Sequence, residues 1–356
     1  MRVALLFDGG SALDTAPDLL IMQTVEAIET ALADEGNTVV RIPISLEGRW
    51  IDRIKRGRFD VAFNMCEGID GVAEMEPPVI SVLELFGVAY TGSSSYTTSL
   101  CLRKHVVNAL LSQASLPVPP WITLRRGSRI RSVGYPAIIK PAAEDASIGV
   151  EQRSVVRTAR ALKARVEAMH QTFDEVIVQR YVSGRELNVG IVGDTILPIA
   201  EIDFSAMPKG MWRMVTYRSK WETGSDEDLG AQPRCPAGLT ARSANEVRRV
   251  ALEAWRLVGG QGYGRVDMRL DDNGQPWILE VNSNPDIAPD AGLARMARTA
   301  GIEYATLVRT ITELGVTRKR DQQPQYAQWL LAQQLSGMQV GVGAAPELAL
   351  FAAGTR

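Results

Sequence analysis

The chain has 356 residues, with 39 Lys and Arg against 41 Asp and Glu, so its formal net charge at pH 7 is −2. This balance argues against a nucleic-acid-binding protein, whose affinity comes largely from an excess of basic groups. Basic residues do cluster at 49–58 and 125–131, but acidic residues elsewhere offset them, and we interpret both clusters as solvated faces. The length predicts two or three domains.

Cysteine usage and hydropathy exclude further classes. The chain has 3 Cys and 2 His, and Cys66, Cys101 and Cys235 form no C-x-x-C pair, so we expect neither a structural zinc site nor a disulfide scaffold. The first apolar run, Val3–Phe7, reaches Asp8 too soon for a signal peptide, and no stretch approaches the ~20 apolar residues of a membrane span. We therefore expect a soluble, cytoplasmic protein without a membrane partner.

Residues 1–100 have the pattern of a parallel α/β sheet. An apolar run at 3–7 ends at Asp8-Gly9-Gly10, and a periodic segment and a second strand follow. Strands that alternate with helices predict a parallel sheet. The G-x-G-x-x-G spacing of a dinucleotide site is absent. The expected elements are strands at 3–7, 38–44, 60–64 and 88–91, helices at 17–35 and 77–86, and a loop at 92–95.

A different pattern begins near residue 101. In residues 101–183 we expect a helix at 104–114, a strand at 137–140, a polar loop through 149, a strand, a helix at 158–170 and a strand at 175–181. In residues 184–316 we expect alternation over 187–202, an unpatterned stretch at 206–236, a helix at 241–258, two strands and a helix near 290–300. The Gln-rich tail, 317–356, predicts an amphipathic helix followed by a disordered end or an oligomer contact.

The most informative segment is a hairpin predicted around Asn273-Gly274. Asn-Gly between two alternating runs is a strong signal for a two-residue turn, which here would pair Asp272 with Gln275. Side chains two residues apart share one face of a strand. The register therefore gathers four polar side chains on one face of the hairpin: Arg265, Asp267, Glu280 and Asn282.

Two carboxylates this close repel each other unless a cation lies between them. Opposed β-carbons in a hairpin are only ~5 Å apart, and three oxygen ligands beside an arginine suit one or two Mg²⁺ ions that carry nucleotide phosphate. The alternative is a surface ladder in which Arg265 neutralises Asp267 and Glu280. The hairpin alone does not decide between these two interpretations.

Two further segments favour a nucleotide site. Lys140 ends an apolar run and faces the small-residue loop 142–149, and a lysine beside free backbone N–H groups is suited to bind phosphate. Residues 179–182, followed by Gly184-Arg185-Glu186, predict a strand, a turn and a carboxylate that could accept hydrogen bonds from ribose hydroxyls. Each signal is weak alone.

Taken together and in this order, these segments resemble the ATP-grasp ligases, and among them the D-alanine–D-alanine ligase-like group. The resemblance covers about residues 1–316 and is most specific at 264–267 and 279–285. Supporting segments are 90–93, Lys104 in its helix, 139–142, 184–187 and 235–239. The resemblance implies an α/β fold of three domains: a Rossmann-like parallel sheet in 1–100, and two α+β subdomains, 101–183 and 184–316, that hold ATP between them.

The resemblance also implies roles for the matching positions. The implied ATP-binding residues are Lys104, Lys140, Ser147, Gln179, Arg180, Tyr181, Val182, Glu186 and Lys220. The implied ligands of two Mg²⁺ ions, which Mn²⁺ could replace, are Asp267, Glu280 and Asn282. The implied catalytic residues are Arg265, which would steady the charged intermediate, Lys220 and Asp14. The implied substrate-binding residues are Asp14, Trp221, Arg265, Asp286, Asp290, Ala291 and Gly292.

The implied activity is that of an ADP-forming carboxylate–amine ligase, which activates a carboxylate as an acyl phosphate before an amine attacks it. Phosphoryl transfer needs positioning and charge neutralisation more than a protein nucleophile. Because an acyl phosphate hydrolyses readily, water must be excluded. Residues 206–236 exceed the ~12–15-residue ceiling for featureless loops, so we expect a closing lid there that carries Lys220.

The substrate half departs from the family pattern. The family's acid after the glycine pair corresponds to Asp14, its loop Ser to Ala146, its lid Tyr to Trp221, and its Ser at the start of the last helix to Ala291. Each lost hydroxyl hydrogen bond costs on the order of 1 kcal/mol. We therefore expect an acyl donor other than D-alanine and an amino acid or similar small amine as acceptor. Asp14 and Asp290 also suit helix N-caps.

Three other functions compete with this one. An authentic D-alanine–D-alanine ligase of cell-wall synthesis is the first alternative, and a phosphotransferase on the same scaffold is the second. A nucleotide-binding module without turnover is the third, and the intact set of Lys, Arg and acidic positions argues against it. The resemblance further implies a homodimer.

Overall fold

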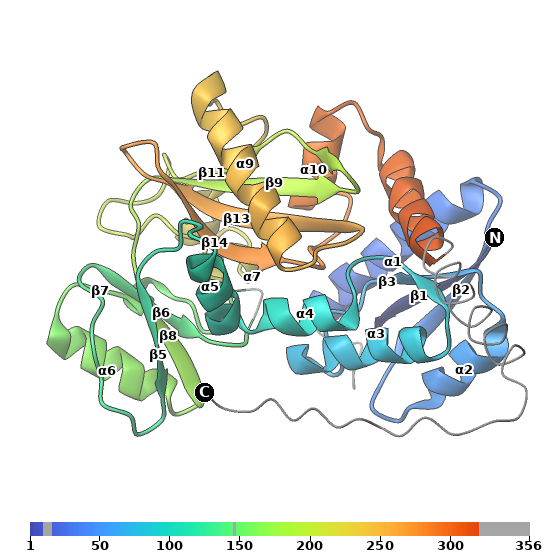
Figure 1. The fold of residues 1–356 in the computed structure, drawn as a ribbon, viewed down its shortest axis with the longest axis horizontal. Coiled ribbons are helices and arrows are strands. Elements are labelled where there is room, and N and C mark those ends of the chain that lie inside the picture. Colours follow the sequence, from blue (N-terminus) through green and yellow to red (C-terminus); the bar gives the residue numbers. More distant parts are fainter. Residues whose placement is uncertain (10–15, 145–146, 320–356) are drawn as a thin grey trace, which may run out of the picture. The chain divides into compact units, whose positions relative to one another are not determined.

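Three β-sheets carry the fold of residues 1–316, which form one compact unit (Figure 1). The computed structural model describes residues 1–9, 16–144 and 147–319. Residues 317–356 are a second unit. The predictions for Asp14 and for the tail from residue 320 onward concern positions outside the described residues.

The first sheet is parallel and has the strand order β2-β1-β3-β4. Its strands are β1 (Arg2–Asp8), β2 (Thr38–Ile44), β3 (Val61–Asn64) and β4 (Ala89–Tyr90). Its helices are α1 (Ala16–Asp34), α2 (Arg49–Gly57) and α3 (Glu76–Leu85), with a 3₁₀ turn at Ala73–Met75. Crossover helices bury both faces of a parallel sheet, which explains why β1 is a continuous apolar run. The predicted Rossmann-like parallel sheet is confirmed.

The two faces of β1 belong to two separate cores. Val3 and Leu5 pack with residues of α1, whereas Ala4 and Leu6 pack with residues of α2 and α3. Helix α2 was not expected. Its sequence is dominated by basic residues, and only two apolar side chains, Trp50 and Ile54, pack into the core. The remaining face of α2 is solvated, as predicted.

The second sheet is antiparallel, with the order β5-β8-β6-β7. Its strands are β5 (Trp121–Arg125), β6 (Ala137–Pro141), β7 (Val155–Val156) and β8 (Glu175–Arg180). Helix α6 (Ala159–Met169) and a 3₁₀ turn (Gln152–Ser154) pack on this sheet. Helices α4 (Ser95–Leu102) and α5 (Lys104–Gln113) precede it in the chain and contribute side chains to the core of the third sheet. The loop predicted at 92–95 is thus short and gives way to α4, whose N-cap Ser94 accepts the N–H of Thr97.

The third sheet has the order β12-β11-β9-β13-β14, and β10 pairs with β9. Its strands are β9 (Arg185–Val192), β10 (Thr195–Ile196), β11 (Ala200–Asp203), β12 (Gln232–Arg234), β13 (Tyr263–Leu270) and β14 (Pro276–Asn282). The helices are α7 (Tyr217–Trp221), α8 (Asp226–Leu229), α9 (Ala241–Leu257) and α10 (Gly292–Thr299), and residues 304–316 are also helical.

Helix α9 covers one face of the third sheet (Figure 1). Leu187 and Val189 of β9 and Val266 of β13 pack with Val250 of α9 in this core. Side chains alternate along a strand, so the intervening residues of β9 and β13 point to the opposite face. That face carries the polar residues of the predicted site.

The unpatterned stretch 206–236, where we expect a lid, contains three short elements, α7, α8 and β12. Thr216 caps α7 and is fully buried, and its hydroxyl donates to Glu227 at 2.6 Å. Gln152, on the 3₁₀ turn of the second sheet, accepts the N–H of Trp212 at 2.6 Å. Elements of three to five residues have no room for a periodic pattern, which is why the sequence did not reveal them.

The hairpin of β13 and β14 differs from the prediction in two places that cancel. Asp271 donates its N–H to the carbonyl of Gln275 at 3.0 Å, so the turn encloses the three residues 272–274 rather than two. The pairing is therefore shifted by one residue near the turn, where Met268 lies opposite Ile278. A β-bulge at Leu279 restores the predicted register beyond that point.

The first and third sheets share a core and a hydrogen-bond network. Tyr263 of β13 is 1% exposed and packs in the same cluster as Val3 and Phe63. Its hydroxyl donates to Asn284 at 2.6 Å, and the Asn284 amide donates to the carbonyl of Cys66 at 3.1 Å. No helix in the described part of the chain is long and apolar enough to cross a membrane.

Candidate functional site

Four polar side chains of the hairpin lie together as the register predicted. Asp267 is paired with Glu280, and Arg265 with Asn282. The guanidinium of Arg265 donates twice to Asp267, at 2.7 and 2.8 Å. Arg265 and Asp267 are each only 17% exposed. Arg265 thus pairs with Asp267 as the ladder interpretation expects, but largely buried rather than on the surface.

The two predicted phosphate-binding lysines reach this cluster from other elements. Lys104, at the start of α5, is 7% exposed, and its Nζ lies 3.4 Å from Oε1 of Glu280. The same ammonium donates to the carbonyl of Glu144 at 2.7 Å. Lys140 of β6 donates to the carbonyl of Leu279, the bulge residue, at 3.5 Å. The second sheet and α5 thus bring two cations to the face that β13 and β14 present.

The charge of Arg265 is fixed by its surroundings. Burial by itself would lower the pKa of Arg265, but the adjacent carboxylates of Asp267 and Glu280 outweigh burial and raise that pKa above its usual value. Arg265 therefore stays protonated at every accessible pH. A permanent positive charge in a partly dry site suits the stabilisation of a negatively charged intermediate.

Strand β9 adds two contacts that sequence reasoning missed. Asn188 lies opposite Asp267 and donates to its Oδ1 at 2.7 Å. Arg269 lies opposite Glu186, and the two side chains form an ion pair of 2.9 Å. Arg269 continues the alternation of Arg265 and Asp267 along β13, and that alternation was the available signal. Nothing in the sequence tells which strand pairs with β13 on its other side.

Glu186 is a buried carboxylate of this face. Burial raises its pKa, and Arg269 opposes that rise, with Lys220 among the weaker opposing cations. Lys220 and Trp221 lie on α7, where Trp221 is 40% exposed and its ring centroid is 6.3 Å from that of Tyr217.

The segment 179–182 ends β8 beside residues 206–236. The hydroxyl of Tyr181 donates to the carbonyl of Arg213 at 2.8 Å. Gln179 is 1% exposed, and its Nε2 has no hydrogen-bond partner among the described residues. Arg180 is exposed and Val182 is half-buried. A buried, unsatisfied donor is costly, so Gln179 is suited to a partner that binds there.

The N-terminus of α10, predicted to bind a substrate carboxylate, offers fewer N–H groups than expected. Ala291, not Asp290, is the N-cap of α10, and no side chain caps the helix. The N–H of Ala291 already donates to the carbonyl of Ala288 at 2.9 Å. Of the two N–H groups predicted to bind the carboxylate, that of Gly292 is therefore the one to consider. Asp290 and Asp286 are exposed, and Asp286 accepts the N–H of Ala288 at 2.8 Å. Ser147 has a φ of +61°, which places it in the turn of the loop 142–149.

The oxygen donors of the hairpin fit a hard divalent cation. Within the described residues no group of three or more His, Cys, Asp or Glu side chains could hold a metal ion. The predicted set reaches three ligands only because the amide of Asn282 joins Asp267 and Glu280 on one face. The Asn282 amide oxygen accepts the N–H of Asn284 at 2.9 Å, which fixes its orientation. Carboxylate and amide oxygens are the ligands that Mg²⁺ prefers.

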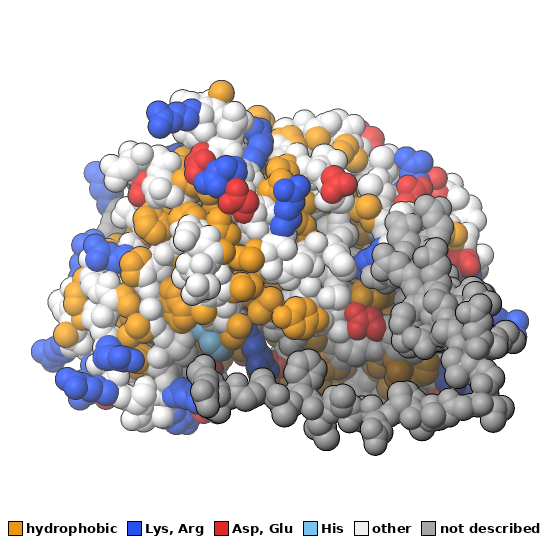
Figure 2. Space-filling model, viewed as in Figure 1, with side chains coloured by type: hydrophobic (Ala, Val, Ile, Leu, Met, Phe, Trp, Pro, Cys, Tyr) orange, Lys and Arg blue, Asp and Glu red, His pale blue; other side chains and the backbone are white. Residues whose placement is uncertain are grey.

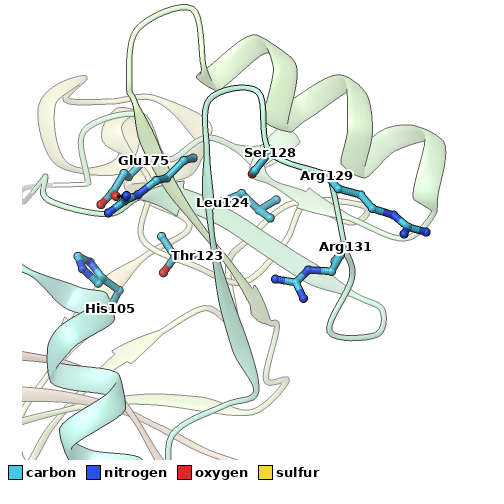
Figure 3. Close-up of a pocket in the computed structure, with 8 residues that line it drawn as sticks. His105, Thr123, Leu124, Ser128, Arg129, Arg131 and Glu175 are labelled. Atoms are coloured by element: carbon cyan, nitrogen blue, oxygen red, sulfur yellow. Dashed lines mark hydrogen bonds and ion pairs between the residues drawn. The ribbon is translucent and has the colours of Figure 1, made fainter.

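A cavity of about 560 Å³ lies elsewhere, beside β5, and contains no predicted site residue (Figure 3). His105, Thr123 and Arg129 are among the residues that line it (Figure 3). Arg125, at its rim, is 81% exposed and paired with Glu175 at 2.6 Å. Arg126 of the same cluster is 52% exposed and paired with Asp174 at 3.0 Å. Blue Lys and Arg side chains are spread over the surface that Figure 2 shows. The second basic cluster is therefore a solvated face, as predicted.

Comparison with known proteins agrees with this geometry. Residues 110–313 match the family model of the D-Ala–D-Ala ligase C-terminus. The chain is 32% identical over 289 residues to the D-alanine–D-alanine ligase of Dechloromonas aromatica (strain RCB), covering 78% of this chain and 91% of that protein. It is 35% identical over 257 residues to the ligase of the same name from Alkalilimnicola ehrlichii, covering 70% and 76% of the two chains.

A solved structure shares the fold. It is the D-alanine–D-alanine ligase from Bacillus anthracis complexed with ATP, which matches with a TM-score of 0.72 and 21% identity over 90% of this chain and 100% of that one. The family model spans more than half of the chain, and the curated relatives match over most of their own length. The chain therefore belongs to the D-alanine–D-alanine ligase family of ATP-dependent carbon–nitrogen ligases.

Proposed function

We propose that this ligase activates a carboxylate with ATP as an acyl phosphate and joins it to the amine of an amino acid or similar small molecule. The observation that carries the proposal is the half-buried cluster on one face of β13 and β14, where Arg265 and Lys104 pair with the two carboxylates. Such a site neutralises phosphate charge without a protein nucleophile, which is what phosphoryl transfer requires.

In the proposed reaction a carboxylate oxygen attacks the γ-phosphorus of ATP, and ADP leaves. The amine then attacks the acyl carbon, loses a proton and expels inorganic phosphate, which leaves an amide. Lys104 and Lys140 would hold phosphate oxygens, and Arg265 would face the charged intermediate. Glu186 would accept the ribose hydroxyls, beside an adenine held by residues 179–182.

The proposal includes Mg²⁺, held by Asp267, Glu280 and Asn282. The ion would neutralise the negative charge of the triphosphate. This chain supplies the rest: Asn188 orients Asp267 through its 2.7 Å hydrogen bond, and Arg265 donates two further hydrogen bonds to the same carboxylate. Residues 206–236 would exclude water from the acyl phosphate, with α7 carrying Lys220 toward the γ-phosphate.

The acyl donor is decided by the residues that surround the substrate. The names of the curated relatives favour D-alanine as both substrates. Two positions of this chain argue for another donor: Trp221 stands where the resemblance expects Tyr, and Ala146 where it expects the loop Ser. A missing hydroxyl leaves a substrate carboxylate or amine without a hydrogen bond worth on the order of 1 kcal/mol. We therefore propose a donor other than D-alanine.

The test is an ADP-release assay with Mg²⁺ over a panel of carboxylic acids and amino acids, each alone and in pairs. We expect turnover only when a suitable acid and amine are both present, and none with D-alanine as the sole substrate. Robust turnover with D-alanine alone would establish the D-alanine–D-alanine ligase alternative. Release of ADP with one acid, without free phosphate until an amine is added, would separate a ligase from a phosphotransferase.

A further inference from the structure

Arg269 is a buried arginine to which the proposed reaction assigns no step. It lies on β13 two residues beyond Asp267, on the same face of the sheet, and its side chain is 3% exposed. Taking a guanidinium out of water is expensive unless a carboxylate pairs with it and acceptors satisfy its N–H groups. Its partners therefore indicate what the site gains from it.

Three acceptors hold the guanidinium of Arg269. Its Nη2 lies 2.9 Å from Oε2 of Glu186. Its Nη1 donates to the carbonyl of Gly184 at 3.0 Å, and Nη2 also donates to the carbonyl of Arg213. Glu186 lies near the start of β9, Gly184 lies in the turn before it, and Arg213 lies in the segment 206–236. One side chain thus joins parts of the site that are far apart in the chain.

The carbonyl of Arg213 accepts hydrogen bonds from two different parts of this site. It accepts a hydrogen bond from the hydroxyl of Tyr181 at 2.8 Å as well as the one from Arg269. The next residue, Met214, is 3% exposed and packs with Tyr181 in a small core of its own. The guanidinium carbon lies 5.5 Å from the ring centroid of Tyr181, within the range of a cation–π contact.

We infer that Arg269 is a positioning residue for nucleotide binding. It fixes the carboxylate of Glu186 in a dry site and fastens the segment 206–236 to the same face of the sheet through Arg213. The inference rests on the proposed function, in which Glu186 accepts ribose hydroxyls and that segment carries Lys220. Methionine would fill much of the same space, but it could neither pair with Glu186 nor donate to two carbonyls.

The experiment compares Arg269→Met and Arg269→Lys with the control Arg185→Met. Arg185 adjoins Glu186 in the chain and also forms a carboxylate pair, but its partner is Glu201, at 2.6 Å, on the other face of β9. Isothermal titration with ATP, in the absence of an acyl donor, gives the dissociation constant. We expect Arg269→Met to weaken ATP binding about 10- to 100-fold, Arg269→Lys to weaken it less, and Arg185→Met to leave it unchanged.

Steady-state kinetics adds a readout that a general loss of stability would not produce. The KM for ATP should rise in Arg269→Met by a larger factor than the KM values for the acid and the amine. A double variant, Arg269→Met with Glu186→Gln, tests the route. If Arg269 acts through Glu186, the dissociation constant of the double variant for ATP should be no higher than that of the single variant that binds ATP less tightly. If the losses in binding free energy of the two single variants simply add in the double variant, that route is overturned.

Limited trypsin digestion tests the second arm independently of catalysis. Lys209, Arg213 and Lys220 offer cleavage sites in the segment 206–236. We expect faster cleavage there in Arg269→Met than in Arg185→Met, with the rest of the chain equally protected. ATP binding and digestion that both match the wild type would overturn the inference. If the wild-type chain bound no ATP, the proposed function would fail, and digestion alone would decide whether Arg269 fastens the segment.

Discussion

Asp267 and Glu280 face each other across the hairpin, but different cations neutralise them. Asp267 accepts two hydrogen bonds from Arg265 at 2.7 and 2.8 Å, whereas Nζ of Lys104 is 3.4 Å from Glu280. Glu280 is also the more exposed of the two, at 27% against 17%. Glu280 can therefore turn toward a cation with less loss of existing contacts than Asp267.

Glu280→Gln should abolish most activity without unfolding the protein. The variant removes one charged ligand of the proposed Mg²⁺ site, while Lys104 keeps its bond to the carbonyl of Glu144. Because even groups that only support metal ligands cost 10- to 100-fold when lost, we expect ADP release to fall by at least about 100-fold. The measurement is ADP release as a function of Mg²⁺ concentration, where the half-saturating Mg²⁺ concentration should rise.

The matched control for this prediction is Glu246→Gln. Glu246 is a carboxylate on the outer face of α9, paired with Arg249 at 2.6 Å and remote from the hairpin cluster. It should keep wild-type turnover and wild-type Mg²⁺ dependence. Full activity of Glu280→Gln at limiting Mg²⁺ would contradict the assignment of Glu280 as a ligand.

Asp271 gives the hairpin turn a pH-dependent stability. Burial tends to raise the pKa of Asp271, but hydrogen bonds from the Trp277 indole and from the N–H groups of Gln275 and Asn273 outweigh it and lower the pKa. A carboxyl whose folded pKa is lowered stabilises the fold above its unfolded pKa, ~3.9, and loses that contribution as the pH falls through the folded pKa.

Asp271→Ala should therefore destabilise the protein at pH 7 by about 1–2 kcal/mol. The difference from the wild type should shrink as the pH is lowered below about 4. Urea denaturation at pH 7, pH 5 and the lowest pH at which the protein stays folded measures both effects. A difference that is constant over this range would show that ionisation of Asp271 does not matter.

At the scale of elements, the turn between β8 and β9 depends on a glycine. Gly184 has a φ of +133°, and a Cβ placed there would lie 2.1 Å from the backbone oxygen of Leu270. Neither backbone can give way without moving β9 along β13. The carbonyl of Gly184 also accepts a hydrogen bond from Arg269, so the turn and the site share this residue.

Gly184→Ala should destabilise the protein by about 3 kcal/mol or more, because it combines a backbone clash with a disfavoured φ. Gly274→Ala is the control, since Gly274 also has a positive φ, +79°, but a Cβ there would meet no atom within 4 Å. It should lose only about 1–2 kcal/mol. Thermal unfolding of both variants separates the clash from the φ cost, and equal losses would exclude the clash.

For the hairpin of β13 and β14, the sequence predicts the strands and their shared polar face, but not the turn length or the bulge. Asn-Gly and the alternation on both sides predicted two strands that share a polar face, and β13 and β14 do so. The turn length was wrong because Asp271 closes a three-residue loop with its own side chain as acceptor. The bulge at Leu279 was not foreseeable either, since an extra residue leaves no mark in a pattern of period two.

Contacts between distant strands were beyond the reach of the sequence. The partners of Arg269 and Asn188 follow from the pairing of β9 with β13, and that pairing depends on sheet topology rather than on local pattern. Helix α4 was missed for a local reason, because Ser94 looked like part of a serine loop and is in fact an N-cap. Gln179, by contrast, was identified from its segment, and its role stays a prediction.

At the scale of the whole molecule, Asn284 joins the first sheet to the site hairpin. Its amide accepts from the buried hydroxyl of Tyr263 and donates to Glu76 at 3.0 Å and to the carbonyl of Cys66. Its backbone N–H holds the amide of Asn282. Movement of the first sheet relative to the third would therefore disturb a predicted metal ligand.

Asn284→Ala should lower the free energy of unfolding by about 2–3 kcal/mol, because the Tyr263 hydroxyl would be left buried without this acceptor. Tyr263→Phe removes only that hydroxyl and should cost less. Urea denaturation followed by tryptophan fluorescence gives both values. A smaller loss in Asn284→Ala than in Tyr263→Phe would mean that the amide does not connect the two sheets.

Along β14, the bulge at Leu279 lies between the polar cluster and the tip of the hairpin, residues 272–274. Between the tip and the cluster, the register of β14 against β13 shifts by one residue at Leu279. The carbonyl of Leu279 accepts a hydrogen bond from Lys140. A peptide, dye or surface linker attached at Asn273 would be held on an exposed turn, away from the side chains of Asp267 and Glu280. The tip is the natural handle for tethering this enzyme to a support while it works.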